Sequence, residues 1–202
     1  LSLSPISQTE SGRGALRSTS RRSEKVPIRK PFVLYKTLSV IKTHDDGEKM
    51  RAIMFVCHGN ICRSPTAEFV MKDILEKSGK GKDFFISSAA TSGEELSNPV
   101  YPPARRVLER HGIDCRGKRA VRLKKEDYGK YDLFVCMDGR NVANTLRIFG
   151  SDPEHKIVKL ASFAGTTDDV EDPWYSDRFE EVYGQIREYC LALAEKLVKT
   201  DN

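Results

Sequence analysis

Residues 56–65 read VCHGNICRSP, and this stretch decides the fold. It follows an apolar run at residues 52–56, AIMFV, which predicts a buried strand. Pro65 opens a helical pattern that extends to about Lys77, and proline is well suited to the first turn of a helix. The sequence therefore predicts a strand, a tight loop and a helix N-terminus in immediate succession.

The loop between this strand and this helix has the features of an anion site. The first turn of a helix leaves backbone N–H groups unpaired at the positive end of the helix dipole. Phosphate is the usual ligand of such a loop. Because Cys57 begins the loop and Arg63 ends it, the loop is also a candidate for phosphoryl transfer.

Each residue type in the loop suits a step of that chemistry. Cys57 is the candidate nucleophile, because a helix N-terminus and Arg63 both stabilise a thiolate, and Ser64 can donate its hydroxyl to the sulfur. The planar fork of Arg63 matches two phosphate oxygens. Gly59 permits close backbone approach and positive φ, and Asn60 tolerates the left-handed conformation. The simpler alternative is a core cysteine that ends a strand and a surface arginine that begins a helix.

A thiolate that attacks a phosphate ester needs an acid to protonate the leaving oxygen. Asp172 is the candidate, in the segment DDVEDPWY at residues 168–175. Pro173 stiffens the backbone after it, and Trp174 and Tyr175 offer flat apolar walls for an aromatic leaving group. The alternative is a solvated acidic loop whose tryptophan fills the core.

The rest of the chain alternates strands and helices. The patterns predict strands at residues 84–86 and 133–137, a possible strand at 157–160 and a weak one at 120–123. They predict helices at residues 102–111, 141–149 and 177–199, and a loop of small residues at 87–93. The fold class is therefore α/β, with a doubly wound, four-stranded parallel sheet flanked by helices in a single domain. Ligands of such sheets bind beyond the carboxyl ends of the strands, which is where Cys57 falls.

Composition narrows the function classes. The 202 residues suit one domain, and no run of about 18 apolar residues predicts a membrane span. Five cysteines without a secretory signal favour reduced thiols and a cytoplasmic place. The four scattered histidines and the absence of a Cys-x-x-Cys pair predict no metal site.

Residues 1–49 differ from the rest in composition. They are rich in Ser and Arg and hold ten Lys and Arg against five Asp and Glu, which equals the net charge of +5 of the whole chain. We expect a disordered basic extension, a targeting peptide or a non-native leader upstream of Met50, followed by the catalytic domain at residues 50–202. Because residues 50–202 are neutral overall, we expect neither a nucleic-acid nor a membrane partner.

Taken together, the motifs resemble the low-molecular-weight protein tyrosine phosphatases. The resemblance covers essentially residues 51–200 and leaves residues 1–49 without a counterpart. It rests on the loop at 57–65 and on the segments Ser87–Ser92, Asn98-Pro99, His111-Gly112-Ile113, Cys136-Met137-Asp138 and Asp172-Pro173-Trp174-Tyr175.

The resemblance implies a two-step reaction on phosphotyrosine without a metal or organic cofactor. Cys57 attacks phosphorus while Asp172 protonates the leaving phenol, and Asp172 then activates the water that hydrolyses the phosphocysteine. Inorganic phosphate is the product and an inhibitor. The implied substrate-binding residues beside Arg63 are His58, Gly59, Asn60, Ile61, Cys62, Ser64, Trp174 and Tyr175.

The resemblance also implies a supporting network and a redox role. Asn60, Ser64 and Ser88 shape the loop through hydrogen bonds, with Asp138 and His111 as outer members. Cys62 matches a second loop cysteine that pairs reversibly with the nucleophile under oxidation, for which an exposed thiolate beside a resolving cysteine is chemically suited.

One segment departs from the family pattern. Where the family often carries an aromatic residue on the pocket rim, this chain has Gly93-Glu94-Glu95. Acidic side chains there predict a preference for basic residues beside the phosphorylated one.

Three alternative functions stay open. The first is a protein arginine phosphatase on the same fold, whose members tend to carry Thr where this chain has Ile61. The second is a thioredoxin-coupled arsenate reductase, which needs two further cysteines in a loop where Cys115 stands alone. The third is a phosphotyrosine-binding module without turnover, although Cys57, Arg63 and Asp172 are all present.

Overall fold

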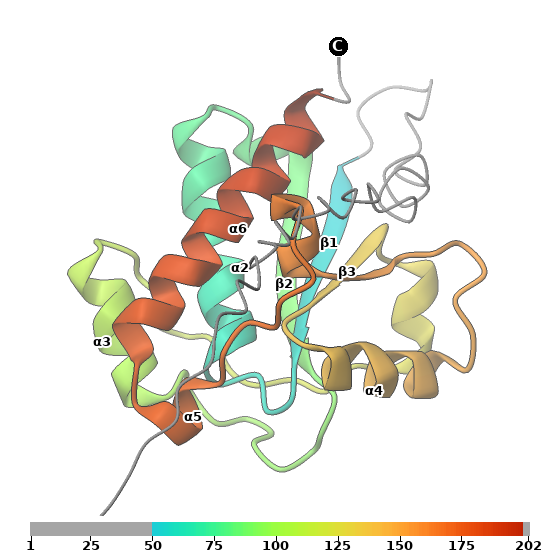
Figure 1. Ribbon diagram of the computed structural model, residues 1–202, viewed down its shortest axis with the longest axis horizontal. Helices are drawn as coiled ribbons and strands as arrows, with labels where there is room; N and C mark the ends of the chain where they lie inside the picture. The colour runs from blue at the N-terminus through green and yellow to red at the C-terminus, as the bar shows by residue number, and fades with distance from the viewer. Residues whose placement is uncertain (1–49, 200–202) are drawn as a thin grey trace, which may run out of the picture. The chain divides into compact units, whose positions relative to one another are not determined.

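The computed structural model describes residues 50–199, and its centre is a four-stranded sheet in the order β2-β1-β3-β4 (Figure 1). All three strand pairings are parallel, which confirms the predicted fold class. The strands are β1 (Arg51–Cys57), β2 (Phe84–Ala90), β3 (Leu133–Cys136) and β4 (Ile157–Lys159). The predicted extension at residues 1–49 lies outside the described residues, so the division into extension and domain stays a prediction.

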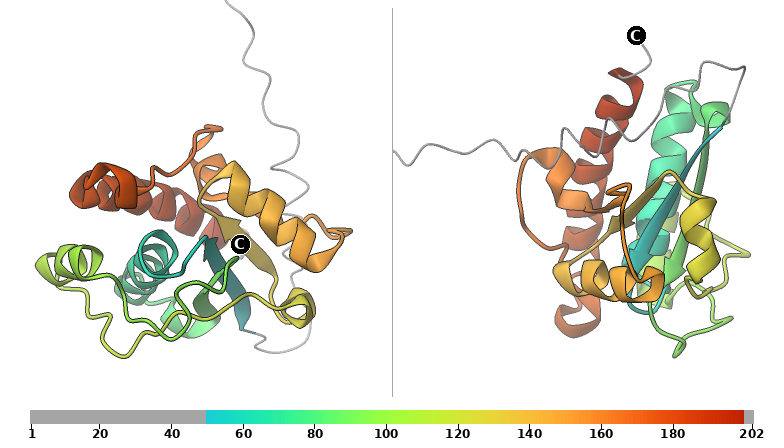
Figure 2. Two further views of the ribbon diagram at one scale, coloured as in Figure 1. Left: turned by 90° about the horizontal axis from the view of Figure 1, so that it is seen from below. Right: turned by 90° about the vertical axis from the view of Figure 1, so that its right-hand side faces the viewer.

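Helices cover both faces of the sheet, as the end-on view in Figure 2 shows. One face packs against α2 (Arg63–Lys77), α3 (Pro102–Arg110) and α6 (Phe179–Lys199). The other face packs against α4 (Gly139–Phe149) and the short helix η2 (Lys125–Gly129). A parallel strand between two such layers is buried on both sides, which is why β1 is a continuous apolar run rather than an alternating one.

The side chains of β1 supply both cores in turn. Ile53 and Phe55 join the core beneath α2 and α6, whereas Met54 and Val56 join the core beneath α4. Cys57 closes the strand at its carboxyl end and points to the first of these cores. The period of two along a buried strand thus fixes the side of the sheet on which the cysteine lies.

Two predicted strands differ from the observed ones. β2 starts at Phe84 as predicted but continues through the small residues to Ala90, because residues 87–90 keep register with β1 as far as the pair Cys57–Ala90. The predicted strand at residues 120–123 is wrong. Within this segment only Arg122 makes a bridge, an isolated parallel one to Ala90 at the end of β2, and Arg119 just before it bridges Pro99.

The observed helices shift from the predicted bounds for local reasons. α4 begins two residues early because Asp138 caps it, with Oδ1 accepting from Asn141 N at 2.7 Å. A four-residue helix, α5 (Pro173–Ser176), was not predicted, and Asp177 ends it at φ 58°. Because of that turn, α6 begins at Phe179 and not at the predicted residue 177.

The remaining short helices are η1 (Gly81–Asp83) and η3 (Leu160–Ala164). Leu160 was predicted to end the strand at 157–160 but is the first residue of η3. Among residues 50–199, no helix has the length and apolar character to cross a bilayer.

Candidate active site

The loop of residues 57–64 connects β1 to α2 at the carboxyl edge of the sheet. Cys57 is the last residue of β1, and α2 starts at Arg63. Cys62, at the cap position of this 15-residue helix, makes no side-chain cap hydrogen bond, so no cap side chain occupies the first N–H groups of α2. Those groups and the helix dipole are available to an oxyanion.

Asn60, and not Gly59, takes the left-handed conformation in the loop. Asn60 has φ 58°, whereas Gly59 is absent from the positive-φ residues, so the expected positive φ at Gly59 is corrected. The role of Gly59 is instead to leave room for the side chain of Glu95. A Cβ at this position would lie 3.1 Å from Cγ of Glu95, closer than the two groups normally approach.

The sulfur of Cys57 lies within a set of hydrogen-bond donors. Ser64 Oγ is 3.0 Å from Cys57 Sγ, and the backbone N–H of Asn60 donates to the same sulfur at 3.3 Å. The Asn60 side chain ties the loop to β2, because Nδ2 donates to Ser64 Oγ at 2.9 Å and to Ser88 Oγ at 2.7 Å. Hydrogen bonds of this kind favour an anionic sulfur.

Arg63 is buried between two carboxylates. Its side chain donates to Asp138 Oδ2 and to Asp172 Oδ2, each at 2.6 Å, and to the carbonyl of Val170 at 3.2 Å. Although burial alone would lower the pKa of Arg63, the nearby Cys57, Asp172 and Asp138 outweigh it and raise that pKa. The guanidinium is thus held in place and permanently charged at the N-terminus of α2.

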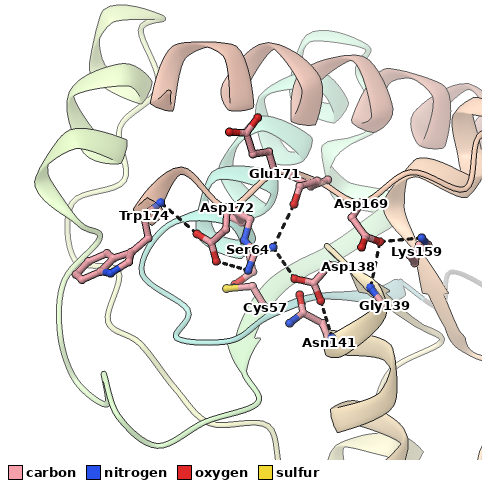
Figure 3. Close-up of polar contacts among 12 residues, drawn as sticks. Cys57, Ser64, Asp138, Gly139, Asn141, Lys159, Asp169, Glu171, Asp172 and Trp174 are labelled. Carbon is pink, nitrogen blue, oxygen red and sulfur yellow. Dashed lines mark hydrogen bonds and ion pairs between the residues drawn. The ribbon is translucent and has the colours of Figure 1, made fainter. Parts of the chain in front are cut away.

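Asp172 is the acid of the 168–172 segment that faces the nucleophile (Figure 3). Asp169 instead binds Lys159 Nζ and Gly139 N, and Glu171 pairs with Arg178. Asp172 caps α5 by accepting from Trp174 N at 3.2 Å, which fixes its carboxyl next to Arg63.

The aromatic residues after Asp172 stand at the mouth of the site. Trp174 packs on Tyr101 with ring centroids 4.9 Å apart, and Tyr101 is tied to the loop because its N–H donates to the Ile61 carbonyl at 2.8 Å. Tyr175 is 85 % exposed. Both rings are therefore available to a substrate.

These elements enclose a pocket of about 200 Å³. The pocket is smaller than the roughly 300–1,000 Å³ typical of sites for whole small molecules. It therefore suits a single side-chain group of a larger substrate. The lining brings together Cys57, Arg63 and Asp172 with His58, Gly59, Ile61, Cys62, Trp174 and Tyr175.

The sequence and the fold match known proteins. The family model for low molecular weight phosphotyrosine protein phosphatases matches residues 52–202. This chain belongs to that family. The protein-tyrosine-phosphatase YfkJ of Bacillus subtilis is 32 % identical over 152 residues, covering 74 % of this chain and 97 % of its own. The human low molecular weight phosphotyrosine protein phosphatase is 33 % identical over 162 residues, covering 72 % and 95 %.

Solved structures agree with this assignment. The crystal structure of YfkJ superposes with a TM-score of 0.74 at 31 % identity, covering 78 % of this chain and all of YfkJ. A structure of YwlE arginine phosphatase gives a TM-score of 0.67 at 27 % identity, covering 73 % of this chain and 96 % of its own. The predicted family and the phosphatase and hydrolase classes are thereby confirmed.

The rim of the pocket carries two acidic residues. Glu94 and Glu95 line the pocket, and His58 Nε2 lies 3.0 Å from Glu94 Oε2. Both partners of this pair are more than half exposed, so solvent screens their attraction. A cationic substrate group can therefore compete with His58 for Glu94.

Cys62 lines the same pocket as Cys57. Burial, followed by the neighbouring Cys57 and Asp172, raises the pKa of the Cys62 thiol well above its ordinary value. Cys62 is therefore a neutral thiol in the resting site. Its oxidative pairing with Cys57 stays a prediction.

The structure places His111 elsewhere, which corrects its expected membership in the loop network. Its ring stacks on Tyr183 of α6 with centroids 4.0 Å apart, and Nε2 lies 2.6 Å from Glu180 Oε1. His111 therefore joins α3 to α6. The other expected members, Ser88 and Asp138, do contact the loop residues Asn60 and Arg63.

Sequence reasoning missed two charged residues next to this network. Glu68 accepts a hydrogen bond from Ser88 Oγ at 2.6 Å, and Lys118 lies 2.8 Å from the same carboxylate. Glu68 could have been suspected, because it lies four residues after Ser64 and so on the same helix face. No sequence pattern pointed to Lys118, because its position depends on the path of residues 115–123 past the end of β2.

Proposed function

We propose that this chain hydrolyses phosphotyrosine in proteins and peptides, and aryl phosphate monoesters, through a phosphocysteine on Cys57. The observation that carries the proposal is that Cys57, Arg63 and Asp172, which are far apart in the sequence, line one pocket. Arg63 reaches Asp172 at 2.6 Å, and the sulfur has donors within 3.3 Å.

In the first step, the thiolate of Cys57 attacks phosphorus in line with the leaving phenol oxygen. The S–P bond forms as the P–O bond breaks. Arg63 and the N–H groups of the loop hold the three equatorial oxygens. Such positioning and electrostatic stabilisation supply most of the catalysis in phosphoryl transfer. Because the phosphoryl group supplies a new anion to Arg63 beside Asp172, it favours the protonated carboxyl, which gives its proton to the phenol.

In the second step, Asp172 works in the reverse direction. Its carboxylate takes a proton from water, the water oxygen attacks phosphorus, and the S–P bond breaks. Inorganic phosphate and the Cys57 thiolate are the products. Phosphate binds the same loop as the substrate does, so we expect it to inhibit competitively.

The residues at the rim of the pocket predict which substrate is preferred. Trp174 and Tyr175 offer aromatic surface to a phenol ring, and Ile61 adds an apolar wall. Glu94 and Glu95 bring negative charge to the pocket edge. We therefore expect a phosphotyrosine with basic neighbours to be preferred to one with acidic neighbours.

A protein arginine phosphatase is the second candidate. The acids at the rim favour it, because a guanidinium leaving group is cationic and Glu94 and Glu95 line the pocket. The branched apolar side chain of Ile61 favours a phenol over a guanidinium, and on this ground we place phosphotyrosine first.

The five cysteines among the described residues are all unpaired thiols. This observation supports a reducing, cytoplasmic place for the chain, which is part of the proposal.

Steady-state hydrolysis of a phosphotyrosine peptide beside a phosphoarginine peptide, near pH 6 without added metal, tests the function. We expect turnover of phosphotyrosine that Cys57→Ser abolishes and that the matched variant Cys115→Ala retains. A preference for phosphoarginine would overturn the substrate assignment in favour of the second candidate. Binding of either peptide without turnover would instead indicate a binding module.

A further inference from the structure

A run of basic residues follows α3 and has no part in the proposed reaction. Residues 116–125 read RGKRAVRLKK, with six basic residues and no acidic one. Two of the six are paired, Arg116 with Asp114 and Lys118 with Glu68. The other four are exposed, and no carboxylate of the described residues lies within ion-pair distance of them: Arg119, Arg122, Lys124 and Lys125. We call these four residues the basic strip.

The excess of positive charge in the basic strip is local. Residues 50–202 hold equal numbers of basic and acidic residues, so the strip does not reflect a basic domain. The next acidic residues along the chain are Glu126 and Asp127, and Asp127 already accepts from Lys124 N at 2.9 Å and lies 3.2 Å from Lys130 Nζ. Because neighbouring cations repel one another, their clustering without counter-ions favours a partner of opposite charge.

The backbone beneath the basic strip is held by hydrogen bonds. The Ala120 N–H donates to the Asn98 carbonyl at 2.9 Å, and the Val121 N–H donates to the Asn60 side chain at 3.0 Å. Ala120 and Leu123 are buried, which leaves the charged side chains on the outer surface. A surface fixed in this way binds a partner at a lower cost in conformational entropy than a free loop does.

The basic strip reaches the rim of the pocket. A Cβ on Gly93 would lie 3.9 Å from Arg122 Nη1 and 3.9 Å from Leu96 Cδ1, so both side chains border this glycine. The next residue, Glu94, lines the pocket. Leu96 and Val121 are each 48 % exposed, so apolar surface lies among the cations. The strip therefore extends the edge of the pocket with a surface that is basic and partly apolar.

An acidic segment of a protein fits this surface better than a nucleic acid does. Its carboxylates can pair with the guanidinium groups of the strip, and an apolar side chain between them can contact Leu96 and Val121. A single-stranded nucleic acid would lack stacking partners, because residues 116–125 contain no aromatic side chain. Its phosphates would also meet Glu94 and Glu95 at the pocket edge.

We propose that the basic strip docks an acidic segment of the substrate protein, several residues away from the phosphotyrosine. The proposal rests on the proposed function, because it takes the pocket as the phosphotyrosine site. It adds a second determinant of substrate choice. Glu94 and Glu95 select the residues next to the phosphotyrosine, whereas the strip selects residues farther along the chain. Because an extended residue spans at most about 3.6 Å, we expect a spacer of roughly four to six residues to cross the rim.

A set of phosphotyrosine peptides tests this docking surface. The residues next to the phosphotyrosine are alanine in every peptide, and a block of Glu or of Gln stands about five residues before or after it. For one of the two block positions, we expect the wild-type kcat/KM to be about threefold to tenfold higher for the Glu peptide than for the Gln peptide at low salt. The gain should come from a lower KM and should shrink at high salt.

Variants of the strip show whether these residues cause the gain. Arg119→Gln/Arg122→Gln should lower the Glu-to-Gln ratio of kcat/KM to about one, and Arg119→Glu/Arg122→Glu should lower it further. Because the Gln peptide is the reference within each variant, a change in the pocket itself cancels from the ratio. The matched control is Arg106→Gln/Arg147→Gln, which removes two exposed cations from α3 and α4 and should keep the wild-type ratio.

A wild-type ratio near one at both block positions would overturn the proposal, and so would a ratio that Arg119→Gln/Arg122→Gln leaves unchanged. Binding of single-stranded DNA or of phosphatidylserine vesicles that this variant loses, together with a wild-type peptide ratio near one, would reassign the strip to those partners. An inactive wild type would defeat the proposed function alone, because the Kd values of the same phosphopeptides, measured by fluorescence anisotropy, still give the Glu-to-Gln ratio.

Discussion

At the residue scale, one side chain joins the acid to the phosphate site. Arg63 holds Asp138 with one nitrogen and Asp172 with the other, and the planar fork fixes both distances at 2.6 Å. A lysine offers a point charge without that geometry, which explains why this position requires an arginine. The carboxyl of Asp172 is therefore held by the same guanidinium that we propose to bind the phosphate.

Replacement of this acid tests its role in leaving-group protonation. In Asp172→Asn, the side chain can still accept from Trp174 N and cap α5, but it cannot give a proton. We expect kcat/KM for phenyl phosphate, which reports the first step, to fall by about 10²–10⁴. The fall for p-nitrophenyl phosphate should be smaller, because that phenolate leaves readily without a proton.

The matched control for this variant is Asp177→Asn. Asp177 has φ 58°, a conformation that Asn also tolerates, and it ends the same short helix. Its kcat should stay near the wild-type value. Equal losses of kcat/KM on both phenyl esters in Asp172→Asn would contradict a role in protonation of the leaving group.

The acids of the rim give a second prediction at this scale. Glu94→Gln keeps the size of the side chain and removes its charge. The ratio of kcat/KM for basic-flanked to acidic-flanked phosphotyrosine peptides should fall about threefold to tenfold at low salt, and less at high salt. Glu126→Gln on η2 is the exposed control. A ratio that is the same in Glu94→Gln, or in Glu94→Trp, as in the wild type would refute selection by this rim.

At the element scale, the segment that carries Asp172 is anchored rather than free. Asp169 Oδ1 accepts from Gly139 N at 3.1 Å and from Lys159 Nζ at 2.8 Å, which ties the segment to α4 and β4 (Figure 3). Val170 adds a hydrogen bond from its N–H to the Met137 carbonyl at 2.8 Å. The general acid thus depends on contacts made three residues before it.

Loosening that anchor should slow catalysis without removing any reacting group. We expect Asp169→Ala to lower kcat about tenfold, because a small displacement of the acid weakens proton transfer. KM for the phosphotyrosine peptide should change little. The neighbouring Asp168→Ala, whose carboxylate accepts a hydrogen bond from the nearby Thr166 hydroxyl, should retain the wild-type kcat. Equal effects of the two replacements would contradict the anchoring role.

The comparison of sequence and structure is also clearest in particular elements. β1, the loop and α2 were predictable because an apolar run, glycine, asparagine and proline each act locally. The ends of β2 and α4 were not, because register with β1 and the cap at Asp138 decided them. The false strand at residues 120–123 failed for the opposite reason, since strand propensity found no continuous partner.

The residues of the site also divide into those that the sequence could predict and those that it could not. That Cys57, Arg63 and Asp172 meet in one pocket could be predicted, because their motifs are local in sequence and the family resemblance joined them. Their catalytic roles stay a prediction. His111 was misplaced and Lys118 missed, because their partners, Glu180 and Glu68, are 69 and 50 residues away along the chain. Pairings over such separations depend on the packing of whole elements.

At the scale of the whole molecule, α6 supplies more buried residues than any other helix to the core on one side of the sheet. Ile186, Leu193 and Leu197 are fully buried in the core that also holds Phe55 and Cys57. The loop that carries Cys57 therefore rests on a core that α6 shares with α2 and α3. Damage to that core should lower global stability before it alters the chemistry.

A pair of leucines on α6 tests this view. Leu193→Ala, at 0 % exposure, should lower the free energy of unfolding by about 2–5 kcal/mol. Leu191→Ala, at 37 % exposure, should lower it by no more than about 0.5 kcal/mol. Urea unfolding curves fitted with a shared m-value measure the change in the free energy of unfolding for both variants. The kcat of the folded fraction should be unchanged in both variants. Equal losses for the two leucines would contradict the assigned core.

The most direct test of the whole account is detection of the phosphorylated enzyme. The wild-type protein is acid-quenched while it turns over a phosphotyrosine peptide, and the bound phosphate is located by peptide mapping. The account predicts phosphate on Cys57 in the wild type and none on the protein in Cys57→Ala. Turnover without enzyme-bound phosphate, or phosphate on another residue, would contradict it.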